Sequence, residues 1–125
     1  DTKKIDEYSK RAKEQWGKTP EYKEYEKKTQ NMSDEDELAM VDEFMQIFAE
    51  FGQMMSLELS DEAVQTQVKK LQDYITEHFY TCTKEILNGL GKMYSAGGEF
   101  TENIDRAGGS GSAEFTAKAI EVYCR

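Results

Sequence analysis

Residues 78–105 read HFYTCTKEILNGLGKMYSAGGEFTENID, and the rest of the chain is organised around this stretch. Thr83 can accept a hydrogen bond from a free amide of the turn that follows it, as the N-cap of a helix does. The apolar residues after it recur at helical spacing; they are Ile86, Leu87, Leu90, Met93 and Tyr94. We therefore predict a helix from Thr83 to about Ala96, which Gly97-Gly98 ends.

The whole chain favours the same class of structure. Its 125 residues suit one domain, and 38% apolar residues with a single proline are typical of a small helical protein. Helix starts are predicted at Ser33, Ser60, Thr83 and Thr101, and a last helix follows the glycine-rich loop 108–112. Because no run of 18 apolar residues occurs, we expect no membrane segment. The two cysteines are too few for a disulfide framework, so we expect reduced thiols and a cytoplasmic location. The fold class predicted for residues 31–125 is an all-α body of about five helices.

Residues 1–30 differ from this body because they are very polar. A thin apolar stripe ends at Trp16, Gly17 interrupts it, and Thr19-Pro20 is a typical helix start. Two such short helices bury little surface and are marginal in water on their own. We expect a mobile two-helix arm over residues 1–30, whose exposed rings must be covered by the body or by a ligand; these rings are Trp16, Tyr22 and Tyr25.

The charge is uneven along the chain. The net charge is −9, yet residues 1–30 carry nine Lys/Arg and seven Asp/Glu. Binding to a phosphate backbone depends on basic side chains, so the acidic body disfavours direct contact with nucleic acid. If the protein contacts DNA, another part of the polypeptide must make that contact. The start at Asp1 suggests a fragment of a longer protein or a processed chain.

Cys82 is the first candidate for chemistry. Near the start of a helix, a thiol can be accessible, have a low pKa and add to an electrophile. The alternative, which spacing alone favours, is a structural thiol in the core. His78 lies four residues earlier, but no third group that could orient a Cys–His pair is evident. One histidine and the distant Cys82 and Cys124 do not supply the three or four ligands of a metal site. We therefore predict no catalytic residue, no metal and no cofactor.

The aromatic and neighbouring residues are candidates for binding a large apolar ligand. For Phe79 and Phe100, ordinary core packing is an equal alternative. The full set of predicted ligand-binding residues is Trp16, Tyr22, Tyr25, Phe79, Tyr80, Cys82, Met93, Tyr94 and Phe100.

Five motifs in this order resemble a known family; they are YSKRAKEQWG at 8–17, TPEY at 19–22, FYTC at 79–82, GLGKMY at 89–94 and FTENID at 100–105. Together they resemble the TipAS antibiotic-recognition domain, the C-terminal effector domain of MerR-type regulators, from about Tyr8 to Tyr123. The resemblance implies a globin-like all-α fold with a deep cleft, over which the N-terminal arm folds when ligand binds. It also implies that full-length members are homodimers with an N-terminal helix-turn-helix, which is absent here and through which they contact DNA.

The resemblance further implies roles for particular residues. Cys82 occupies the motif position at which a thiopeptide-binding member adds to a dehydroalanine of the antibiotic. Trp16 and Tyr22 match lid positions, and Tyr94 and Phe100 match positions beside the cleft. The expected function is that of a ligand-sensing domain of a transcriptional activator that binds bulky small-molecule or peptide antibiotics. The alternatives are a helical protein-interaction module and a stand-alone resistance protein that sequesters the drug. An enzyme is not expected, since no acid–base or metal constellation supports one.

Overall fold

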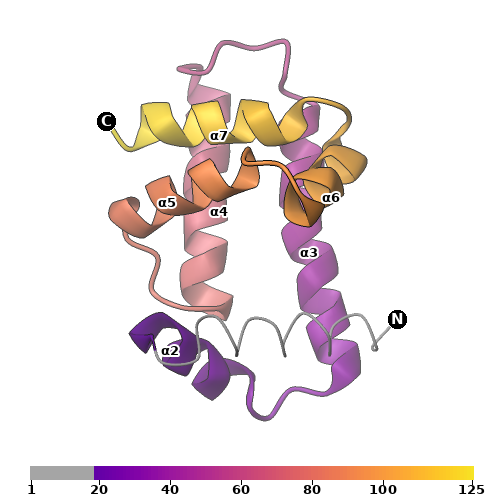
Figure 1. The fold of residues 1–125 in the computed structure, drawn as a ribbon, viewed down its shortest axis with the longest axis vertical. Coiled ribbons are helices and arrows are strands. Elements are labelled where there is room, and N and C mark those ends of the chain that lie inside the picture. Colours follow the sequence, from indigo (N-terminus) through magenta and orange to yellow (C-terminus); the bar gives the residue numbers. More distant parts are fainter. Residues whose placement is uncertain (1–18) are drawn as a thin grey trace.

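The computed structural model describes residues 19–125, which form six α-helices and no strand (Figure 1). The helices are α2 (Pro20–Thr29), α3 (Asp34–Gly52), α4 (Glu62–His78), α5 (Lys84–Tyr94), α6 (Glu99–Gly108) and α7 (Ser112–Tyr123). The five helices after residue 31 confirm the predicted all-α body. The first predicted helix of the arm and Trp16 lie outside the described residues.

The two long helices α3 and α4 form the frame of the fold (Figure 1). α7 packs against both of them. α6 packs on α3, and α5 packs on α7. α2 lies against the C-terminal end of α4. α4 shows why the sequence folds this way, because its buried apolar residues recur every three or four positions and form one stripe; they are Val64, Val68, Leu71 and Ile75. The α3 side of the core is formed by Ile47, Phe48 and Phe51.

Two glycines set the distance between α3 and α6. A Cβ atom added at Gly52 would lie 2.0 Å from the carbonyl oxygen of Gly108, far inside van der Waals contact. The backbones of the two helices therefore touch directly at this crossing. This contact fixes the position of α6, which carries Phe100.

The helix starts confirm the predicted N-caps Thr19, Ser33 and Thr83 and correct two others. The Thr83 hydroxyl accepts a hydrogen bond from the Ile86 amide at 3.1 Å, as predicted. α4 is capped by Asp61 rather than Ser60, because the Asp61 carboxylate accepts from the Ala63 amide at 2.9 Å. α6 already begins at Glu99, and its N-cap is Gly98, whose φ of +94° favours glycine.

Thr101 has a different role from the predicted cap. Its hydroxyl donates to the carbonyl oxygen of Tyr94 at 2.7 Å and accepts from the Gly97 amide at 3.0 Å. Since Tyr94 is the last residue of α5, this side chain ties the end of α5 to the first turn of α6. α5 ends at Tyr94, two residues before the predicted Ala96, and the glycine pair at 97–98 lies in the turn that follows.

Within residues 19–125, each helix is too short or too polar to cross a membrane.

Candidate functional site

A continuous series of seven aromatic rings runs from α2 to α6, and we call it the aromatic chain. Successive ring centroids are separated by 5.7 Å for Tyr22–Tyr25, 5.8 Å for Tyr25–Phe79, 5.2 Å for Phe79–Phe44, 5.1 Å for Phe44–Phe48, 5.3 Å for Phe48–Tyr94 and 5.3 Å for Tyr94–Phe100. All six distances lie in the range of about 4.5 to 7 Å in which aromatic rings attract one another. Five of the seven residues were predicted as binding residues.

The two ends of the aromatic chain are joined through α3. Tyr22, Tyr25 and Phe79 form one end, and Tyr94 and Phe100 form the other. The link is made by Phe44, which is half-buried, and Phe48, which is fully buried. Both belong to the apolar residues that recur at helical spacing in α3, and nothing in that spacing indicates that they connect two groups of candidate residues.

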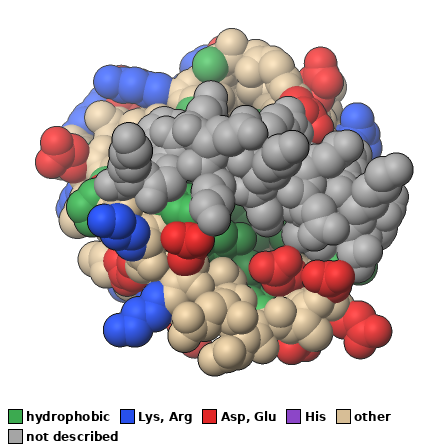
Figure 2. Space-filling view, turned by 60° about the horizontal axis from the view of Figure 1, so that its bottom comes forward, with side chains coloured by type: hydrophobic (Ala, Val, Ile, Leu, Met, Phe, Trp, Pro, Cys, Tyr) green, Lys and Arg blue, Asp and Glu red, His purple; other side chains and the backbone are tan. Residues whose placement is uncertain are grey.

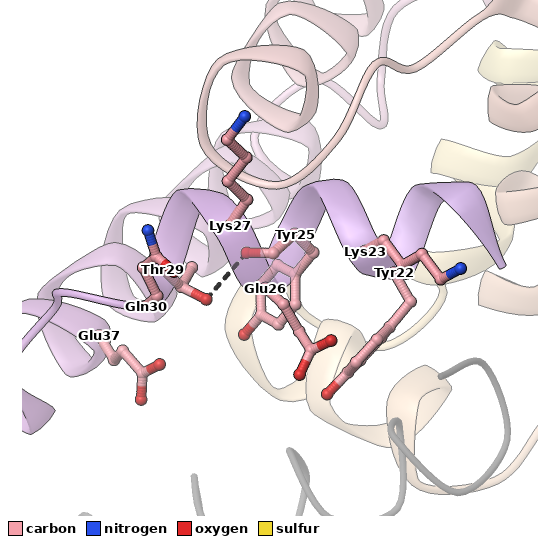
Figure 3. Close-up of a pocket in the computed structure, with 8 residues that line it drawn as sticks. All are labelled: Tyr22, Lys23, Tyr25, Glu26, Lys27, Thr29, Gln30 and Glu37. Carbon is pink, nitrogen blue, oxygen red and sulfur yellow. Dashed lines mark hydrogen bonds between the residues drawn. The ribbon is translucent and has the colours of Figure 1, made fainter. Parts of the chain in front are cut away.

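A hollow of about 520 Å³ lies beside Tyr22 and Tyr25 (Figure 3). Its other lining residues are polar or charged; they are Lys23, Glu26, Lys27, Thr29, Gln30 and Glu37. Tyr22 is buried and Tyr25 is half-buried. On the face of the molecule shown in Figure 2, hydrophobic side chains gather near the centre and acidic side chains lie around them. The hollow itself combines two tyrosine rings with a border in which Lys23 and Lys27 balance Glu26 and Glu37.

Cys82 lies in the core rather than at the surface. Only 4% of its area is exposed, and it belongs to the same cluster of buried residues as Ile75 and Leu87. Burial, with a smaller effect from Cys124, raises the pKa of Cys82 to about 11. The structural thiol that spacing alone favours is therefore confirmed for this conformation, and the alternative of an accessible thiol with a low pKa is wrong for it. The physical reason is position: the residue precedes the N-cap Thr83, and its side chain joins the core instead of facing the free amides of α5.

The other predicted binding residues occupy different environments. Tyr80 is half-buried, and burial raises its pKa to about 12. Tyr94 is almost completely buried, and burial raises its pKa well above the ordinary value. Met93 is 40% exposed and Phe100 is 37% exposed, so both reach solvent. Tyr94 thus anchors the exposed ring of Phe100, which stacks on it.

His78 packs away from Cys82. Its ring centroid lies 4.3 Å from that of Tyr74, and its Nε2 atom lies 3.7 Å from a carboxylate oxygen of Glu77. The backbone amide of Cys82 donates its hydrogen bond to the hydroxyl of Thr76 rather than to His78. In the part of the chain from residue 19 onward, no three His, Cys, Asp or Glu side chains are grouped so as to hold a metal ion.

The fold and this arrangement can be compared with known proteins. The family model described as the TipAS antibiotic-recognition domain matches residues 8–123. The chain belongs to this family. The transcriptional activator mta of Bacillus subtilis is 34% identical over 101 residues, which is 81% of this chain and 39% of that protein. The activator TipA of Streptomyces coelicolor is 31% identical over 104 residues, 82% of this chain and 41% of that protein. The TipAS chain thus spans about two fifths of the length of these relatives.

A solved structure shares the fold. It is TipAS of Streptomyces lividans in complex with nosiheptide, a thiopeptide antibiotic, with a TM-score of 0.79 and 27% identity. The similarity covers 95% of this chain and 84% of that one. The all-α architecture is therefore that of a TipAS domain. The curated relatives are named as transcriptional activators rather than as enzymes.

Proposed function

We propose that this chain is the ligand-sensing effector domain of a MerR-type transcriptional activator and that it binds bulky, thiopeptide-like antibiotics. The observation that carries the proposal is the TipAS family match over residues 8–123. The similarity to TipAS in complex with nosiheptide supports the class of ligand. The apolar contacts that the described surface offers to such a ligand are the rings of Tyr22 and Tyr25 beside a mostly polar hollow and the exposed side chains of Met93 and Phe100.

The proposed ligand surface follows the aromatic chain. Tyr25 and Phe79 present half-buried rings at one end, beside the buried Tyr22, and Phe100 presents a partly exposed ring at the other. Planar rings of a ligand can stack on these faces, and each stacked aromatic pair adds about 0.5 to 1.5 kcal/mol beyond the burial of its area. Trp16, Tyr80 and Met93 complete the proposed site.

We further propose that residues 1–30 act as a lid on the body formed by residues 31–125. If ligand orders the lid, part of the binding free energy is used to fold it. Occupancy of the site by ligand then changes the conformation of the domain. In a full-length homodimer, that change would bias an attached DNA-binding domain. The measurement is an amide NMR spectrum without ligand: protected, dispersed signals throughout residues 5–30 would contradict a lid that folds on binding.

Covalent attachment at Cys82 is proposed as a step that follows the first contact with the ligand and precedes closure of the lid. The Sγ thiolate would form a bond to the β-carbon of a dehydroalanine, and the α-carbon would take a proton. Because Cys82 is buried and its pKa is raised to about 11, the thiol must first become exposed and lose its proton. Adduct formation is therefore expected to be much slower than non-covalent binding, and Cys82→Ser should abolish the mass increase without abolishing binding.

Calorimetric titration with nosiheptide tests the proposal. The unmodified chain should bind nosiheptide. Phe100→Ala should raise the dissociation constant about tenfold, because truncating an aromatic contact residue costs more than about 1 kcal/mol of binding free energy. The matched control is Leu57→Ala, which removes an apolar side chain of similar exposure (40%) from a loop outside the aromatic chain. A folded chain that binds no thiopeptide but retains a stable protein partner would favour the interaction module instead.

A further inference from the structure

One carboxylate of α2 is bonded to the segment that carries Cys82. The Oε1 atom of Glu24 accepts a hydrogen bond from the Thr81 amide at 2.9 Å, and its Oε2 atom accepts one from the Thr81 hydroxyl at 3.0 Å. Both bonds involve an ionised acceptor, and such charge-assisted bonds are stronger and more directional than neutral ones. They lower the pKa of Glu24, the amide bond most of all, so the carboxylate is ionised near neutral pH.

Lys28 joins α2 to the end of α4. Its Nζ atom donates to the carbonyl oxygen of Thr76 and to that of Glu77, and it lies 3.4 Å from the Glu24 carboxylate. These carbonyls belong to the last turn of α4, where a cation also interacts favourably with the helix dipole. Glu24 and Lys28, one helical turn apart, thus attach α2 at two adjacent points.

The opposite side of the same segment is held by α4. The Cys82 amide donates to the Thr76 hydroxyl at 3.1 Å, and the Gln72 side chain donates to the Cys82 carbonyl oxygen at 2.8 Å. Thr81 is therefore bonded to α2 and its neighbour Cys82 is bonded to α4. Thr76 belongs to both networks, since its carbonyl accepts from Lys28 and its hydroxyl accepts from Cys82.

We propose that Glu24 is a positioning residue through which the docking of α2 controls access to the Cys82 thiol. With α2 in place, residues 81 and 82 are fixed from two sides and the thiol stays in the core. Departure of α2 removes both bonds to Thr81 together with the contact of the Tyr25 ring on Phe79, 5.8 Å between centroids. Only the bonds from α4 then hold the segment, so it opens more often. This coupling is a property of the chain alone and does not depend on the proposed antibiotic.

Alkylation of the full chain with iodoacetamide at pH 8, followed by peptide mass spectrometry, tests the coupling. In Glu24→Ala, the labelling rate of Cys82 should rise about threefold, which is the scale expected for loss of a partly exposed charged pair. Cys124 is the second free thiol and serves as an internal reference whose rate should not change. The control is Glu26→Ala, which makes the same change on the same helix. Among the described residues, the hydrogen bonds from a carboxylate of α2 to residues 79–83 come from Glu24 and not from Glu26.

A second variant separates the two bonds. Thr81→Val keeps the shape and the amide bond but removes the hydroxyl bond, so Cys82 labelling should lie between that of the unmodified chain and that of Glu24→Ala. Hydrogen exchange over residues 20–29 reports whether α2 has loosened. Equal acceleration of Cys82 and Cys124 would indicate general destabilisation and overturn the proposal. Faster exchange in α2 with unchanged Cys82 labelling would overturn it as well, because docking and access would then be uncoupled.

Discussion

The crossing of α3 and α6 leaves no room for a side chain at Gly52. A Cβ atom there would lie 2.0 Å from the oxygen of Gly108 and 2.6 Å from its carbonyl carbon and Cα, whereas ordinary contacts begin near 3.4 Å. The obstacle is backbone, which cannot rotate away, so Gly52→Ala must push the helices apart by about 1 Å. Overpacking of a tight contact costs about 1 to 3 kcal/mol, and we expect the upper end of that range here.

Gly89→Ala is the matched control for this substitution. It is the same change within a helix, but a Cβ atom at Gly89 meets nothing within 4 Å. Alanine is favoured over glycine in a helix by about 1 kcal/mol, so this variant should be more stable than the unmodified chain. One substitution at two helical glycines is thus expected to change stability with opposite signs.

Urea unfolding followed by circular dichroism measures both effects. With a slope typical of a small domain, 3 kcal/mol moves the unfolding midpoint by about 1 to 3 M. The midpoint of Gly52→Ala should fall and that of Gly89→Ala should rise. If Gly52→Ala stays within about 0.5 kcal/mol of the unmodified chain, a value usual for neutral surface substitutions, the direct contact between α3 and α6 is refuted.

Three further predictions concern caps, titration and the core. Thr83→Ala should lower the free energy of unfolding by about 1 kcal/mol and Thr83→Ser by much less, since serine keeps the capping oxygen; thermal unfolding checks both. Because burial raises the pKa of Cys82 to about 11, its alkylation rate should keep rising up to pH 10 rather than level off near 9, and a plateau near 9 would show an exposed thiol. The unfolded chain loses that proton at lower pH than the folded one, so unfolding free energy should fall above about pH 9, by at most about 3 kcal/mol; urea midpoints across pH 8–11 measure it. Phe48→Ala, at a residue with no exposed surface, should cost about 3 to 5 kcal/mol, and a smaller loss would mean that its ring contacts contribute little.

Local signals in the sequence predict the helices but not all of their ends. Thr83 is recognisable as a cap because its oxygen needs only the amide three residues later. Thr101 and Ser60 are equally suitable caps by type, yet Gly98, three residues before Thr101, and Asp61, one residue after Ser60, occupy the cap positions. A residue preference does not decide between adjacent candidates, because the final position depends on how the preceding turn meets the body.

The directions in which the side chains of the site point could not be predicted from sequence spacing. A thiol one residue before an N-cap can face the helix amides or the core, and its direction is set by packing against residues such as Ile75 on another helix. The link through Phe44 likewise depends on how α3 lies against the end of α4. By contrast, the order of short motifs along the chain was sufficient to predict the family, whose model matches residues 8–123.

The most direct test of the central claim is a two-dimensional NMR titration of the chain with nosiheptide. The proposed function predicts binding, with the largest chemical-shift changes in the side chains of Tyr25, Phe79, Phe44 and Phe100 and small changes in the loop at residues 109–111, which lies outside the aromatic chain. Saturating nosiheptide that leaves the spectrum unchanged would contradict the claim that this TipAS domain senses thiopeptides. Shifts confined to residues outside the aromatic chain would contradict the proposed binding surface.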